Sequence, residues 1–137
     1  MLPQLLISAS AAIVLTVGTL HLVYTFFGPK LRPRDPELEA RMKEVSPVIT
    51  SQTTMWKTWI GFNASHSLGL MLFGVLYGYL SIFQFQVLLQ ARFLLLVGAI
   101  FLVSFLVLAK RYFFRIPLAC IASSLVLYVV GVAAAVV

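Results

Sequence analysis

Four long runs of apolar residues, separated by short connections, limit what this chain can fold into. The runs cover about residues 5–27, 55–80, 91–108 and 117–136. Each is near the roughly 20 residues that an α-helix needs to cross a bilayer. Backbone polar groups inside a membrane must bond within their own segment, so such runs form helices. The sequence therefore predicts an all-α membrane protein with four transmembrane helices.

The composition agrees with lipid as the solvent for most of the chain. Hydrophobic residues make up 61% of the sequence and charged residues 10%, whereas soluble domains are about 45–50% apolar. A soluble chain of 137 residues has too little interior to bury so much apolar surface. We expect residues 1–137 to form a single integral membrane domain.

The basic residues lie almost entirely in two of the three connections. Five are in the polar connection 28–54 and three are in residues 110–115, whereas Arg92 alone lies on the opposite side. The positive-inside rule places both basic connections in the cytoplasm and both termini on the other side of the cell membrane. This distribution also accounts for the net charge of +6, so we expect no binding to nucleic acid. Short connections make successive helices antiparallel, which predicts an up-down four-helix bundle.

The polar connection 28–54 holds all four acidic residues and predicts a short cytoplasmic amphipathic helix between the first two spans. Asp35 suits the N-cap, Pro36 suits the first helical position, and Pro47 marks the end. We expect this helix to lie on the membrane surface, with a solvated connector helix as the alternative. Its acid–base pairs at i,i+4 spacing are Glu37–Arg41 and Glu39–Lys43, and its apolar residues are Leu38, Met42 and Val45.

Aromatic and basic residues mark the cytoplasmic ends of the spans. Tryptophan rings favour the headgroup level, and lysine can extend its charged end to the same surface. The segment 110–115 is expected to be a tight basic turn that anchors the topology, or alternatively binds anionic headgroups. Residues 81–90 are expected to be a short polar hairpin on the other side. The predicted headgroup anchors are Trp56, Lys57, Lys110, Arg111 and Arg115.

Residues 56–69, WKTWIGFNASHSLG, concentrate hydrogen-bonding side chains within an apolar span. At about 100° per residue, polar and small residues share one face of this span, and leucines fall opposite. His21 lies on a similar face of the first span, about 9 Å inside its end, and His66 lies about 15 Å inside the second. The two imidazoles are therefore able to meet. The candidate site residues are His21, Asn63, His66, Ser67, Trp59 and Tyr77.

Three roles for this cluster stay open. The polar side chains can hold helices together, as Ser, Thr, Asn and His commonly do in membranes. His21 and His66 can be the two axial ligands of a b-type haem. The cluster can also bind a small lipophilic molecule or perform acid–base chemistry on it, with Asn63 orienting a carbonyl. A metal site is not predicted, because the spans hold no acid and Cys120 is the only cysteine.

Three segments carry a resemblance: GTLH at residues 18–21, MWKTWIGF at 55–62 and RYFFRIP at 111–117. In these segments the chain resembles a family of small, uncharacterised bacterial four-helix inner-membrane proteins. The resemblance covers most of the chain and implies four spans in the inner membrane. It carries no activity to any residue here, and Asn63 and His66 lie outside the three segments.

The sequence favours a non-enzymatic integral membrane protein, either an accessory or assembly subunit or a module that binds a lipophilic ligand. No acid lies inside a span and no nucleophile motif is present. Membrane lipids are the expected partners, together with other membrane-protein subunits. The alternative is that His21, Asn63 and His66 form an intramembrane site for haem b or for acid–base chemistry. This alternative includes an enzyme, so the sequence leaves enzymatic activity open.

Overall fold

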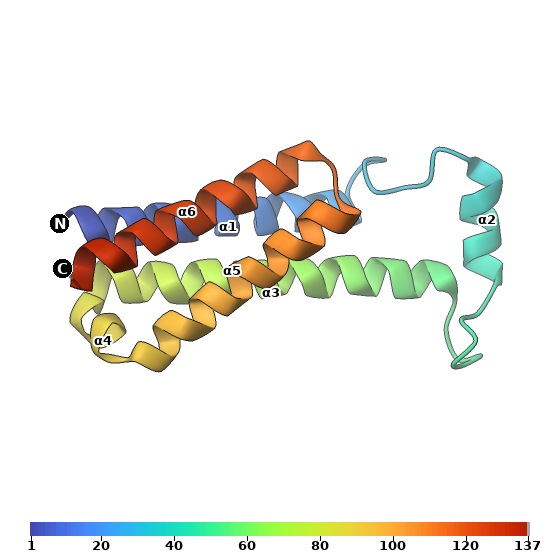
Figure 1. Cartoon of the computed structure of the whole chain (residues 1–137). Helices are drawn as coiled ribbons and strands as arrows, with labels where there is room; N and C mark the ends of the chain where they lie inside the picture. The colour runs from blue at the N-terminus through green and yellow to red at the C-terminus, as the bar shows by residue number, and fades with distance from the viewer. Residues whose placement is uncertain (137) are drawn as a thin grey trace. The chain divides into compact units, whose positions relative to one another are not determined.

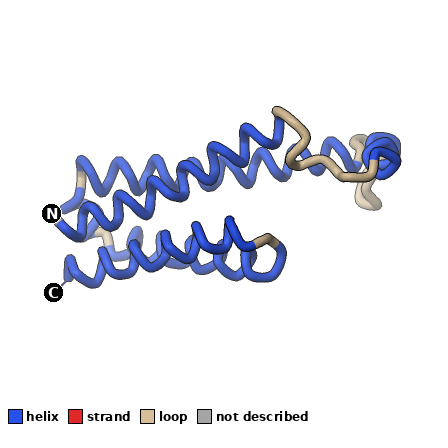
Figure 2. Tube along the Cα trace, turned by 90° about the horizontal axis from the view of Figure 1, so that it is seen from above, coloured by secondary structure: helices blue, strands red, loops and turns tan. Residues whose placement is uncertain are grey.

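The computed structural model describes residues 1–136, which form α-helices joined by short loops (Figure 1, Figure 2). Four of these helices are long and apolar enough to cross a membrane, so the chain is a multi-pass membrane protein. The predicted fold class, including a short helix between the first two spans, is confirmed. The helices are α1 (Leu2–Phe26), α2 (Pro36–Glu44), α3 (Met55–Phe83), α4 (Phe85–Gln90), α5 (Arg92–Tyr112) and α6 (Arg115–Val136).

Contacts divide the chain into two units. The first unit contains Met1–Val17 and the chain from Leu70 onward, and so includes parts of all four spans. The second unit is Gly18–Gly69, which contains the end of α1, the polar connection with α2, and the start of α3.

The four spans of the first unit pack in the expected up-down order (Figure 1). Gly74 of α3 lies so close to Leu15 of α1 that a Cβ at this glycine would be 2.5 Å from the leucine Cβ. At Gly131 of α6, an added Cβ would be 2.8 Å from Cγ1 of Ile7. Small residues let membrane helices approach in this way. Gly78 contributes less, since a Cβ there would meet only Ala11, at 3.8 Å.

Buried hydroxyl groups join the spans of the first unit. Ser10 and Ser124 are fully buried, their hydroxyl oxygens are 2.7 Å apart, and Ser124 also donates to the Ser10 carbonyl. Tyr128 donates its hydroxyl proton to the carbonyl oxygen of Leu95 at 2.9 Å. A hydroxyl left unpaired in an apolar interior is costly, so these bonds connect α6 to α1 and to α5.

The two faces of α3 agree with the prediction from its periodicity. Ser67 and Leu70 are buried, as expected for the inward face. Leu72 and Val75, which the periodicity places on the opposite face, are 68% and 57% exposed. Exposed apolar side chains on a span are the surface that lipid covers.

Two connections differ from the sequence prediction. The predicted hairpin at 81–90 is wrong, because α3 continues to Phe83 and the next residues form α4, in which Leu88 is fully buried. Gln84 is the non-helical residue between α3 and α4, whereas Gln86 and Gln90 lie within α4, as suits a good helix former. The predicted basic turn is also shorter, since Lys110 and Arg111 lie in the last turn of α5. Cations are favoured at that end of a helix dipole.

In the second unit, α2 begins and ends close to the predicted positions. The side chain of Asp35 accepts a hydrogen bond from the Glu37 backbone N–H at 2.9 Å, and Pro36 is the first helical residue. This satisfies one of the unpaired donors at the helix start. After the helix ends, the Met55 backbone N–H donates to the carbonyl oxygen of Val45 at 2.8 Å, which joins the loop to the start of α3.

One of the two predicted ion pairs of α2 forms as expected. Nζ of Lys43 lies 2.6 Å from Oε1 of Glu39. Arg41 pairs with Glu44 at 3.2 Å and not with the predicted Glu37. The i,i+3 spacing of Arg41 and Glu44 brings side chains together on a helix surface, as the i,i+4 spacing of Glu37 and Arg41 also does.

Candidate functional site

The second unit brings together three of the predicted site residues. Nε2 of His21 in α1 lies 3.0 Å from Oδ1 of Asn63 in α3. The rings of His21 and His66 have their centres 5.1 Å apart, at an interplanar angle of 62°. The two imidazoles from different spans therefore touch edge to face.

The hydrogen bonds of Asn63 fix the direction of its bond to His21. The Asn63 amide nitrogen donates to the carbonyl oxygen of Trp59 at 2.8 Å, so its Oδ1 is the acceptor and His21 Nε2 is the donor. The Ser67 hydroxyl donates to the carbonyl oxygen of Asn63, and the Thr25 hydroxyl donates to that of His21, both at 2.8 Å. This is the bonding that membrane helices use to satisfy polar side chains.

The two imidazoles do not fit as axial ligands of one haem. Ligands on opposite faces of an iron would hold their nitrogens about 4 Å apart, at about 2 Å per metal–nitrogen bond, with the ring centres farther apart still. The rings of His21 and His66 instead contact each other edge to face, with their centres 5.1 Å apart, so in this arrangement the space between them is not open to a haem plane. In the part of the chain that the structure describes, no three His, Cys, Asp or Glu side chains group to hold a metal ion.

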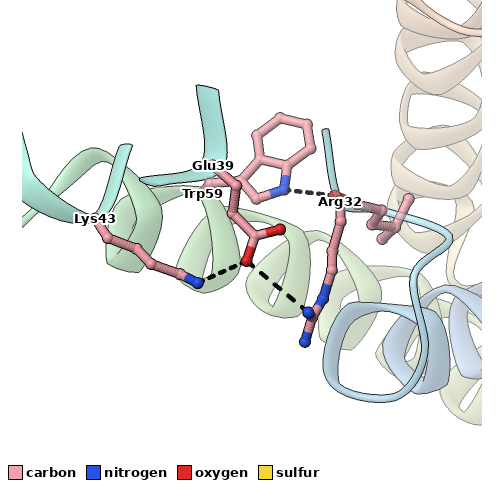
Figure 3. Close-up of polar contacts among 5 residues, drawn as sticks. Arg32, Glu39, Lys43 and Trp59 are labelled. Carbon is pink, nitrogen blue, oxygen red and sulfur yellow. Dashed lines mark hydrogen bonds and ion pairs between the residues drawn. The ribbon is translucent and has the colours of Figure 1, made fainter. Parts of the chain in front are cut away.

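The other two predicted site residues have different surroundings. Trp59 donates its indole N–H to the carbonyl oxygen of Leu31 at 3.0 Å (Figure 3), and so joins α3 to the polar connection. Tyr77 belongs to the first unit, where it is buried and donates its hydroxyl proton to the Leu94 carbonyl at 2.6 Å. Tyr77 therefore bonds one span to another within the first unit.

Two cavities of the second unit share Leu31 and Arg32. We name the larger, of about 390 Å³, the Trp59 cavity, and the smaller, of about 200 Å³, the Thr25 cavity. The Trp59 cavity is lined by Lys30, Leu31, Arg32, Pro33, Leu38, Met42 and Trp59. The Thr25 cavity is lined by Tyr24, Thr25, Phe26, Gly28, Leu31, Arg32, Trp56 and Ile60.

The charged residues that line these cavities, Lys30 and Arg32, are both cationic. Arg32 is 3.8 Å from Oε1 of Glu39, and Lys43 is only 2.6 Å from the same oxygen. Figure 3 shows both cations directed at this carboxylate. The hydrogen bond from Lys43 lowers the pKa of Glu39 below its ordinary value. Lys30 places its Nζ 3.9 Å from the centre of the Tyr24 ring, which is a cation–π contact.

The predicted headgroup anchors are found at helix ends. Trp56 lies in the first turn of α3, with Nζ of Lys43 5.3 Å from its ring centre, and Lys57 beside it is exposed. Lys110 and Arg111 are exposed in the last turn of α5, and Arg115 is exposed at the first position of α6. Their contact with lipid headgroups stays a prediction.

Sequence reasoning missed the basic residues at the cavities. It treated Lys30 and Arg32 only as topology signals. The available signal was the alternation of basic and apolar residues in KLRPR, residues 30–34, beside an amphipathic helix with an apolar face.

Comparison with known proteins adds no family to this description. No family model, curated protein or solved structure matches the chain. The resemblance seen in the sequence is supported only as far as the four-span architecture.

Proposed function

We propose that this small multi-span membrane protein binds an amphiphilic, lipid-like molecule in the Trp59 cavity, as a binding module and not as an enzyme. The observation that carries this proposal is the lining of the cavity, which combines five apolar residues with Lys30 and Arg32. Its volume of about 390 Å³ is within the roughly 300–1,000 Å³ that is usual for small-molecule sites.

The position of the cavity supports the same function. Trp59 stands in the second turn of α3, and the lining segment Lys30–Pro33 follows closely on Phe26, where α1 ends. The cavity is therefore formed at the ends of two spans, near the expected headgroup level. A ligand that arrives from the bilayer can place its apolar chain against Leu38 and Met42 and keep its polar end near the cations.

The bonding of the polar cluster supports a helix-packing role for it. The side chains of Asn63, Ser67 and Thr25 each donate to a backbone carbonyl, and His21 donates to Asn63. This arrangement fixes α1 against α3 within the second unit. The bond between His21 and Asn63 is the one that crosses between the two helices, and the other three lie within one helix each.

The proposal is tested by measuring lipid that stays bound to the purified protein. Native mass spectrometry in a mild detergent should show about one retained lipid per chain, and Trp59→Ala should lose it. Phe62→Ala is the matched control, because Phe62 is an aromatic residue of α3 that is 71% exposed and lines neither cavity. Equal retention by the wild type and both variants would contradict the proposal.

A second candidate function is acid–base chemistry at His21 and His66. The contact of two imidazoles inside the spans favours it, because histidine exchanges protons near neutral pH and intramembrane ionisable groups are often functional. The discriminating measurement is a growth or transport phenotype of His66→Gln. Impaired growth or transport in His66→Gln with unchanged lipid retention would support this candidate. Reduced lipid retention with normal growth and transport would oppose it.

A further inference from the structure

We propose that the ligand is an anionic phospholipid whose phosphate group is bound by Arg32 together with Lys30. This inference rests on the proposed function and adds the chemical class of the headgroup.

Arg32 keeps hydrogen-bond donors for a ligand. Its guanidinium group has five N–H donors, and its contact with Glu39 is 3.8 Å long, which is longer than a direct hydrogen bond. The short bond to that carboxylate comes from Lys43 at 2.6 Å. The guanidinium is thus held near the cavities by charge attraction, while its fork of donors matches the oxygens of a phosphate.

Lys30 supplies a second positively charged residue to the lining of the Trp59 cavity. Its contact with the ring of Tyr24 holds the ammonium group between two neighbouring cavities, because Lys30 lines the Trp59 cavity and Tyr24 lines the Thr25 cavity. Lysine binds phosphate as a point charge and does not need a fixed geometry. The two cations together can neutralise the charge of one phosphodiester.

The described lining residues of both cavities include no Asp or Glu. The acid beside Arg32, Glu39, lines neither cavity, and its charge is balanced by Lys43 at 2.6 Å. A zwitterionic headgroup would bring its own cation close to Arg32 and Lys30, and the repulsion would oppose its binding. Inorganic phosphate would satisfy the cations but leave the apolar walls empty. An anionic headgroup that carries acyl chains satisfies both parts of the site.

The sharing of Arg32 between the cavities fits a lipid with two chains. Leu38 and Met42 line the Trp59 cavity together with Arg32, and Phe26 and Ile60 line the Thr25 cavity together with Arg32. A phosphate at Arg32 therefore has apolar side chains in the walls of both cavities.

The test measures quenching of tryptophan fluorescence by lipids with brominated chains. The chain has two tryptophans, so a Trp56→Phe background reports Trp59 alone. The probes are phosphatidylglycerol and phosphatidylcholine with the same brominated chains, offered to the protein in detergent, and unlabelled inorganic phosphate as competitor. We expect phosphatidylglycerol to bind about tenfold more tightly than phosphatidylcholine, which corresponds to about 1.4 kcal/mol.

Arg32→Gln should weaken phosphatidylglycerol binding more than phosphatidylcholine binding, because both lipids carry the phosphate but only phosphatidylglycerol has a net negative charge, and so should remove most of that preference. Arg34→Gln is the matched control, because this nearby cation lines neither cavity, and it should keep the preference. Arg32→Lys should show an intermediate preference, which separates loss of charge from misfolding. Equal binding of the two lipids, or a preference that survives Arg32→Gln, overturns the inference while the proposed function stands. If neither lipid binds, both the inference and the proposed function are overturned. If inorganic phosphate competes as strongly as unlabelled phosphatidylglycerol, the ligand is a free phosphate and not a lipid headgroup, which overturns the inference.

Discussion

His21 in α1 donates a hydrogen bond from Nε2 to Oδ1 of Asn63 in α3, over 3.0 Å. This bond joins two membrane-spanning helices in a region where lipid offers no competing partner. The same asparagine is bonded to the backbone of Trp59. One amide side chain therefore bonds α3 to α1 and, at the same time, to the backbone of its own helix.

Replacing Asn63 with Ala should lower the free energy of unfolding by about 1 kcal/mol, since interhelical hydrogen bonds in membranes average about 0.6 and reach about 1.7 kcal/mol. The change also leaves the N–H of His21 without this acceptor. Thermal unfolding in detergent, followed by circular dichroism, measures the effect. Ser65→Ala is the control, because the Ser65 hydroxyl is exposed and bonds Phe62 of its own helix. An equal loss in both variants would contradict this role for Asn63.

Helical periodicity was sufficient to predict the intramembrane cluster. His21, Asn63 and His66 lie on regular helices, so their face and depth follow from about 100° and 1.5 Å per residue. The antiparallel order of the first two spans then brings the residues to similar depths. Tyr77 shares the same face of α3, but it lies further along the helix and takes part in the bonding of the first unit.

The two cavities could not be predicted in this way. They depend on the segment Lys30–Pro33, which has no periodicity and contacts Trp59 across 28 positions in the sequence. The path of such a loop is set by tertiary contacts that local pattern does not encode. Helix α4 was missed for a related reason, because the polar glutamines of this segment suggested a hairpin, whereas the burial of Leu88 depends on tertiary contacts.

Gly74→Ala should destabilise the protein by about 1–3 kcal/mol, the usual effect of overpacking. The added Cβ would be 2.5 Å from Cβ of Leu15 and 2.8 Å from its backbone nitrogen, so the helices must move apart. Gly69→Ala is a matched control in the same helix, because nothing lies within 4 Å of a Cβ there. That variant should be neutral or up to about 1 kcal/mol more stable from its helix propensity. A similar change in melting temperature for both variants would contradict the close approach at Gly74.

A double-mutant cycle should detect the buried serine pair. Ser10→Ala or Ser124→Ala alone leaves one buried hydroxyl without the bond that is 2.7 Å long, and should cost about 1 kcal/mol. The double variant should lose less than the sum of the two single effects, because each single change already removes the same hydroxyl–hydroxyl bond. The coupling free energy is measured from unfolding in detergent. Strictly additive losses would show that the two hydroxyls do not depend on each other.

Glu39 should make the stability of the polar connection depend on pH. Its pKa in the folded protein lies below the ordinary 4.5, first because of the hydrogen bond from Lys43. A lowered folded pKa means that the stabilisation is complete above pH 4.5 and is lost as pH falls through the folded pKa. Titration of the Glu39 carboxyl carbon by NMR measures the pKa directly. Lys43→Ala should raise it toward the ordinary value, and an unchanged midpoint in that variant would contradict the assigned cause.

Both termini should lie on the non-cytoplasmic side of the membrane. The contact of Gly131 in α6 with Ile7 in α1 places the two chain ends at the same end of the bundle, and five basic residues in the connection 28–54 favour the cytoplasm for that connection. Alkaline phosphatase fused after Val137 should therefore be active in a bacterial host, whereas a fluorescent protein at that position should stay dark. Replacing three of the five basic residues with Gln should give a mixed orientation, because the rule counts Lys and Arg near the spans. An inactive phosphatase with a bright fluorescent fusion would reverse the orientation and would place the Trp59 cavity on the opposite surface of the membrane.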